Sequence, residues 1–198
     1  MTRIALGMKS HSGWAALVAV GKEKGDWIVI DRRRIELAHE EWAKQPYHAA
    51  EGLKSEAARD LVERGVEAAR RMAAREIEAA IARERERGHE VAACGVLVGE
   101  PMPDWTVHEI LAVHFRMHKA EGELFRDALV RAAKACRLKL IAIPEKLLST
   151  HAQRVVRTSE NSLVTTIAQL GKPLGPPWGR DQKDAALAAL VALEHRSR

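Results

Sequence analysis

The amino-acid sequence predicts an α/β fold, and three features of its hydrophobic pattern support that prediction. Three strand-like runs follow one another within residues 3–37, separated only by short polar turns. A long stretch with helical periodicity comes next, over residues 57–81. Two almost wholly apolar runs, at 91–99 and 138–144, then alternate with helical segments, as expected for strands buried on both faces of a sheet. The sequence therefore predicts five strands covered by helices.

The three opening strands are expected to form an antiparallel meander. Residues 3–8 (RIALGM) are apolar enough for a buried strand, and a second strand, WAALVAVG, follows a turn at 11–13. The segment KEKGD is typical of a hairpin turn, and it leads into a third strand, WIVIDRRRIEL. Short turns of this kind join neighbouring strands, so these three runs should pair in chain order.

Helices are expected between and after the later strands. Apolar residues recur at intervals of three and four over 57–81, and Gly88 is placed to end this helix, because glycine adopts positive φ at little cost. Further helices are predicted at 121–137, as one or two short helices within 146–170, and at 182–195 after a proline-rich loop.

Length and composition favour one domain spanning residues 1–198. The 198-residue chain is 46% hydrophobic, which is enough to bury a sizeable core. It contains no run of eighteen apolar residues and no signal-peptide pattern, so we expect no membrane span and a cytoplasmic protein. Cys94 and Cys136 fit buried thiols better than a disulfide framework. The formal net charge of +5 is compatible with a polyanionic partner, although acidic residues nearly balance the basic ones.

Carboxylates occur at two positions where the predicted elements meet. Glu100 directly follows the fourth predicted strand in GVLVGEPMP. The last helix begins GRDQKDAALAALVAL, in which Asp181 and Asp184 are three residues apart and share one face of the first turn. A functional role for this aspartate pair and a helix N-terminal role remain equal alternatives, since acidic residues also stabilise the start of a helix.

This order of elements and these acidic positions resemble the ribonuclease H-like fold, a five-stranded mixed sheet with helices on both sides. The ending is most similar to that of the Holliday-junction resolvases, whose last helix carries an acidic or histidine residue three positions before an Asp-Ala pair. Asp184 and Ala185 match that pair, and Asp181 matches the preceding residue. On this topology RIALGM should lie at the centre of the sheet, beside VAACGVLVG.

The resemblance implies a metal-dependent nuclease that acts on branched or duplex nucleic acid. Glu100, Asp181 and Asp184 would then be the catalytic residues and the ligands of Mg²⁺ or Mn²⁺, because hydrolysis by two metal ions needs carboxylates that converge from separate elements. A non-catalytic relative that binds nucleic acid or protein is the alternative function. A homodimer is a further alternative that the sequence leaves open.

Lys9 departs from this pattern, because the resemblance places the missing first-strand acid at its position. We consider three interpretations. Lys9 is a solvated turn residue; or its ammonium group lies among Glu100, Asp181 and Asp184 and offsets their charge in place of metal; or another acid, such as Asp31, supplies the missing ligand.

Three other features have both a structural and a functional interpretation. His114 and His118 would share a helix face, but the sequence indicates no third metal ligand near them. Trp178 in the proline-rich loop could contact a base or cover the core. Arg32 and Arg34 lie on the same side of one strand, where they suit either phosphate contact or a solvated edge.

Overall fold

The computed structural model describes residues 1–195 and contains a five-stranded mixed sheet in the order β3-β2-β1-β4-β5. β1 pairs antiparallel with β2 and parallel with β4. β2 pairs antiparallel with β3, and β4 pairs parallel with β5. The strands are β1 (Thr2–His11), β2 (Trp14–Glu23), β3 (Asp26–Glu36), β4 (His89–Val98) and β5 (Lys139–Pro144). The predicted mixed sheet is confirmed, with β1 at its centre beside β4.

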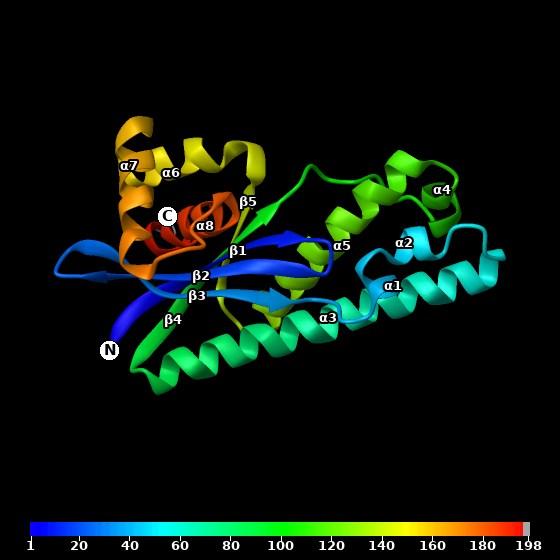
Figure 1. The fold of residues 1–198 in the computed structure, drawn as a ribbon, viewed down its shortest axis with the longest axis horizontal. Helices are drawn as coiled ribbons and strands as arrows, with labels where there is room; N and C mark the ends of the chain where they lie inside the picture. The colour runs from blue at the N-terminus through cyan, green and yellow to red at the C-terminus, as the bar shows by residue number, and fades with distance from the viewer. Residues whose placement is uncertain (196–198) are drawn as a thin grey trace.

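Helices cover both faces of this sheet (Figure 1), and one 3-10 turn precedes α6 and another precedes α8. The long helix α3 and the helix α5 lie on one face, and α8 lies on the other with α6 and α7. Among residues 1–195, no helix is long and apolar enough to cross a membrane. The helices are α1 (Glu41–Lys44), α2 (Pro46–Ala49), α3 (Ser55–Glu86), α4 (Val107–Leu111), α5 (His114–Ala135), α6 (Leu148–Val156), α7 (Glu160–Leu170) and α8 (Arg180–Glu194), and the 3-10 turns are η1 (Glu145–Leu147) and η2 (Lys172–Leu174).

The predicted helix boundaries hold except at α5. α3 ends just before Gly88, which has a φ of 83° as expected of a residue that follows a helix. α5 begins at His114 rather than near residue 121. The first turns of α5 contain mostly polar residues, so their apolar spacing is a weak signal in the sequence. Met117 and Ala120 are nevertheless buried and continue the buried face that includes Leu124.

Alternation along β1 sends successive side chains to opposite faces of the sheet. Ile4, Leu6 and Met8 belong to the core cluster that includes residues of α3 and α5. The alternate residues face α8: Gly7 lies against its backbone, and Lys9 contacts Asp184 in its second turn. Lys9 therefore faces α8 because it lies on the same face of β1 as Gly7.

Glycines on the two central strands allow α8 to approach the sheet closely. Gly7 and Gly95 are register partners in the β1–β4 pair. A Cβ atom at Gly7 would lie 1.9 Å from the carbonyl oxygen of Ala185, and one at Gly95 would lie 2.2 Å from that of Ala188. The facing side of α8 is made mainly of small buried residues, namely Ala185, Ala186, Ala188, Ala189 and Ala192. The helix backbone thus packs directly on the backbone of the sheet.

This close packing predicts that Gly7→Ala destabilises the protein. The added methyl group collides with backbone atoms of α8, so the helix must move, at an expected cost of about 2–4 kcal/mol in the free energy of unfolding. Urea denaturation of the wild type and the variant measures this cost. Gly122→Ala is the control, because its Cβ would meet only the flexible end of Arg126 at 3.3 Å. The control should be neutral or more stable, by up to about 1 kcal/mol, because alanine favours a helix. Equal stability of Gly7→Ala and wild type would contradict the packing.

Candidate functional site

Lys9 is the centre of a charged cluster at one edge of the sheet. Its Nζ lies 2.7 Å from Asp184 Oδ2, 3.1 Å from Glu145 Oε1 and 3.5 Å from Asp181 Oδ1. The Lys9 side chain is only 8% exposed, whereas the three carboxylates are 20–34% exposed. Lys9 is therefore not a solvated turn residue, and its ammonium group lies among carboxylates from two other parts of the chain.

The sheet topology explains how these residues meet. β1, β4 and β5 are parallel to one another, so their C-terminal ends share one edge of the sheet. Lys9 is near the end of β1, and Glu145 directly follows β5 in η1. Asp181 and Asp184 occupy the first two turns of α8, which packs over Gly7. The cluster thus forms where strand ends and a helix start coincide.

The environment keeps Lys9 protonated. Burial by itself lowers the pKa of Lys9, but hydrogen bonds to Asp184 and Glu145 and the charges of these carboxylates raise it, and the net pKa lies above the ordinary lysine value. A permanent cation in the cluster stabilises neighbouring carboxylates by charge-assisted contacts. It is also unable to accept a proton near neutral pH, so Lys9 is unsuited to act as a general base.

His11 extends the cluster towards the surface. Its Nε2 lies 3.0 Å from Asp181 Oδ1, and its ring stacks on Trp14 with a centroid distance of 4.4 Å. The guanidinium group of Arg34 covers the same Trp14 ring at 4.1 Å. Arg34, Trp14 and His11 thus form a stacked column that ends at the acidic cluster.

Glu100, which was predicted to act with the two aspartates, forms its ion pair with Lys146. Glu100 is 69% exposed and accepts a hydrogen bond of 2.6 Å from Lys146 Nζ. That hydrogen bond lowers the pKa of Glu100 below its usual range. Among the described residues, the carboxylates that contact Lys9 are Glu145, Asp181 and Asp184. A metal-binding role for Glu100 stays a prediction.

Glu145 was missed by the sequence analysis, although a usable signal was present. It follows the last apolar strand in the same way that Glu100 follows the fourth. Parallel strands end at one edge, so an acid after either strand was a candidate for the same site. Asp31, the proposed substitute ligand, instead contacts Arg33 at 2.7 Å and Arg83 at 3.4 Å.

The residues of the cluster do not fit the pair of magnesium or manganese ions that the resemblance implies. Two-metal sites hold their ions about 4 Å apart between convergent oxygen ligands. Here the ammonium group of Lys9 already contacts the carboxylates that such ions would need, at 2.7 to 3.5 Å. A lysine ammonium has no lone pair to offer a metal, and its charge repels one. The arrangement is that of an internal ion-pair network.

Two other predicted contact residues have structural roles. Arg32 donates a hydrogen bond of 3.0 Å to the carbonyl of Gly175 in the proline-rich loop. Trp178 covers Gly171 and donates from Nε1 to the carbonyl of Ile167 at 2.9 Å. Both side chains hold the loop before α8 in place, so neither is free for phosphate or base contact.

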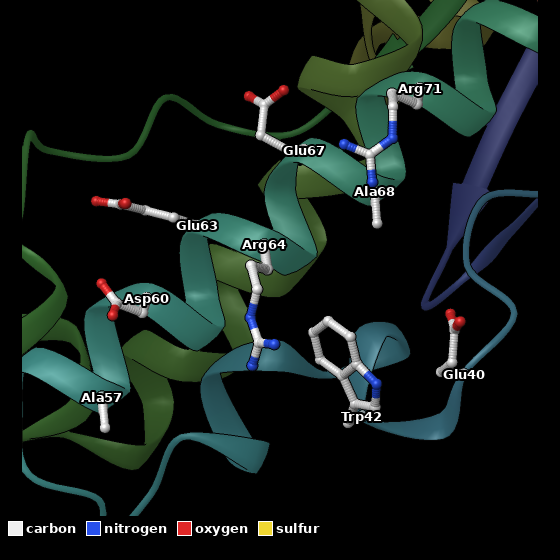
Figure 2. Close-up of a pocket in the computed structure, with 9 residues that line it drawn as sticks. All are labelled: Glu40, Trp42, Ala57, Asp60, Glu63, Arg64, Glu67, Ala68 and Arg71. Carbon is white, nitrogen blue, oxygen red and sulfur yellow. The ribbon is translucent and has the colours of Figure 1, made fainter.

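An open groove of about 840 Å³ lies away from this cluster, between α3 and the segment that contains α1. Figure 2 shows Arg64 and Trp42 pointing toward one another, with the Arg64 guanidinium 5.5 Å from the ring centre. Glu63 and Glu67 extend from α3 away from that pair (Figure 2). This groove is lined by charges of both signs and shares no residue with the Lys9 cluster.

Comparison with known proteins identifies the fold. No protein-family model and no curated protein matches the sequence. RuvC from Thermus thermophilus is similar in structure, with a TM-score of 0.49 and 14% identity over 96% of this chain and 92% of that chain. T. thermophilus RuvC in complex with Holliday junction substrate has a TM-score of 0.52 and 14% identity, over 96% of this chain and 91% of that chain. With the sheet order 3-2-1-4-5, the second match shows that the chain has a ribonuclease H-like fold resembling that of the Holliday-junction resolvase RuvC.

Proposed function

We propose that this protein is a non-catalytic nucleic-acid-binding relative of the junction resolvases, in which Lys9 takes the place of metal ions at the acidic site. The observation that carries the proposal is the position of the Lys9 ammonium group, within 3.5 Å of Asp184, Glu145 and Asp181. Carboxylates that converge without a cation repel one another. Lys9 supplies that cation from within the chain.

The chemistry of lysine argues against hydrolysis at this cluster. A metal ion lowers the pKa of bound water and stabilises the leaving oxygen. A lysine ammonium that is engaged by carboxylates does neither, and its raised pKa keeps it from accepting a proton. The arrangement therefore supports a stable binding surface more than a phosphodiesterase centre.

Duplex or branched DNA is the proposed partner. The support is the fold shared with RuvC, which has been solved in complex with a Holliday junction, together with the formal net charge of +5. Two exposed cations border the cluster: the side chains of Arg180 and Lys146 are 85% and 79% exposed. Cations at this edge of the sheet are placed to contact phosphates, as at other nucleic-acid surfaces.

Substitution of Lys9 tests whether it replaces metal. Lys9→Met should lower the free energy of unfolding by about 2–3 kcal/mol, because it removes the buried cation that all three partly buried carboxylates share. Lys9→Asp should be less stable still in a chelating buffer, since it adds a negative charge. Millimolar Mn²⁺ should restore much of the loss in Lys9→Asp by mass action, and little in Lys9→Met. Thermal denaturation with EDTA and with Mn²⁺ measures these differences.

Two controls make this test specific. Wild type with and without Mn²⁺ gives the metal response of an intact cluster, which should be near zero. Glu100→Gln removes an exposed carboxylate outside the Lys9 contacts and should leave wild-type stability unchanged within about 0.5 kcal/mol. Stabilisation of wild type by Mn²⁺, accompanied by cleavage of a four-way junction, would instead establish a metal-dependent nuclease that uses Glu100, Asp181 and Asp184.

The raised pKa of Lys9 gives a separate expectation at alkaline pH. A lysine whose pKa is higher in the folded state stabilises the fold fully below the unfolded-state value of about 10.4 and stops doing so as pH rises through the folded-state value. The stability difference between wild type and Lys9→Met should therefore be constant from pH 7 to about 9 and shrink above about pH 10.5. Urea denaturation across this range measures it. A difference that persists unchanged to pH 11.5 would contradict the ion-pair contribution.

The DNA-binding proposal predicts a salt-sensitive affinity that depends on Arg180 and Lys146. Fluorescence anisotropy with a labelled four-way junction and a duplex should show binding at low ionic strength that weakens as salt rises. The double variant Arg180→Ala/Lys146→Ala should bind about five- to tenfold more weakly, with a salt slope lower by roughly two. The matched control is Arg75→Ala/Arg85→Ala, which removes the same charge from exposed positions on α3. No binding at low salt, or equal loss in both double variants, would favour a protein-interaction module.

A further inference from the structure

A second cluster of ionisable side chains lies outside the acidic site, where α2 meets the start of α5. It consists of His48 on α2, His114 at the first position of α5 and His118 one turn later. The sequence analysis singled out His114 and His118 but found no third ligand. The fold supplies it, because α2 lies beside the first half of α5 (Figure 1).

The three rings are arranged closely enough to share an ion. One ring nitrogen of each histidine lies within 4.8 Å of a ring nitrogen of each other histidine. Nε2 of His114 and Nε2 of His118 are already 3.1 Å apart. Two nitrogens of a tetrahedral zinc site, each about 2.0–2.1 Å from the metal, are about 3.3 Å apart. The helical pair therefore needs almost no rearrangement, and a ring nitrogen of His48 lies no more than 4.8 Å from each of the other two.

A buried carboxylate orients His48 as a ligand. Nδ1 of His48 lies 2.8 Å from Oε1 of Glu121, and the backbone N–H of His48 donates to the same oxygen at 3.2 Å. The Glu121 side chain is only 3% exposed, so its charge needs a partner. A proton on Nδ1 satisfies the carboxylate and leaves the lone pair on Nε2. This carboxylate–histidine arrangement is the one that supports metal-bound imidazoles.

The free nitrogen of His48 is the unexplained atom of the cluster. Nε2 is buried and has no hydrogen-bond partner within residues 1–195. Buried polar atoms without a partner are rare, and an absent ion is one of the recognised causes. Nothing in the ion-pair network around Lys9 involves this histidine.

We propose that His48, His114 and His118 bind one Zn²⁺ ion, with Glu121 as the carboxylate that positions His48. Imidazole nitrogens suit zinc and neighbouring transition metals rather than magnesium or calcium. His114 and His118 are exposed, so the fourth position is open to water. The site joins the four-residue helix α2, which is too short to be stable alone, to the 22-residue helix α5. Zinc would therefore fasten the connection between β3 and α3 to the rest of the fold.

The experiment uses the full chain without an affinity tag, stripped with EDTA and dialysed. Competition with a chromogenic chelator should give one zinc per chain, bound more tightly than micromolar. Replacement by Co²⁺ should give the visible absorption of a four-coordinate ion, and zinc should raise the melting temperature. His118→Ala and His48→Ala should each weaken binding at least a hundredfold and abolish the cobalt band. Glu121→Gln should weaken it about 10- to 100-fold.

His39→Ala is the matched control, because His39 is exposed and outside the cluster. It should bind zinc as tightly as wild type does. His118 is itself exposed, so its variant should fold normally, and circular dichroism checks this. Zinc affinity that is unchanged in His48→Ala would mean that the helical pair binds alone, and it would overturn the three-histidine site. An absence of binding in folded wild type would mean that His48 serves only as the hydrogen-bond partner of Glu121, and it would overturn the proposal equally.

Discussion

The close approach of α8 to the two central strands is the constraint on which the rest of this structure depends. Gly7 and Gly95 stand side by side on β1 and β4, and a Cβ at either would lie within about 2.2 Å of the helix backbone. Because the backbone of α8 packs directly on the sheet, the side chains of its first turns reach the C-terminal ends of the parallel strands. The position of Asp181 and Asp184 is thus a consequence of backbone packing.

That packing brings carboxylates close together, and the positive charge of Lys9 offsets the repulsion between them. Two aspartates from α8 and Glu145 after β5 meet where one face of the sheet ends. Few water molecules can reach the carboxylates at the end of a central strand, so their negative charges need a cation nearby. Lys9 is on the same face as Gly7, two residues further along β1, and its long side chain reaches all of them. An internal cation balances part of this negative charge permanently.

The two polar clusters differ in how completely they are satisfied. Each carboxylate around Lys9 has a cation within 3.5 Å, although Nε2 of His11, 3.0 Å from Asp181, is itself buried without a hydrogen-bond partner. In the histidine cluster, Glu121 is paired with one ring nitrogen of His48 while the other is buried without a partner. Satisfied networks mainly hold a fold together, whereas unsatisfied buried atoms point to something that binds.

The sequence by itself determined the strands and the main helices, apart from the short helices α1, α2 and α4 and the start of α5, and the tertiary structure decided which side chains meet. Periodicity predicted the five strands, the long helix ending before Gly88 and the last helix, because these depend on local spacing. The acidic start of α8 and the anomaly at Lys9 were also visible. The partners of those residues were not: Glu145 joined Lys9, Glu100 turned to Lys146, and His48 came beside His114. Such contacts join residues far apart in the chain, so their geometry follows from how helices pack on the sheet and from no pattern that is local in sequence.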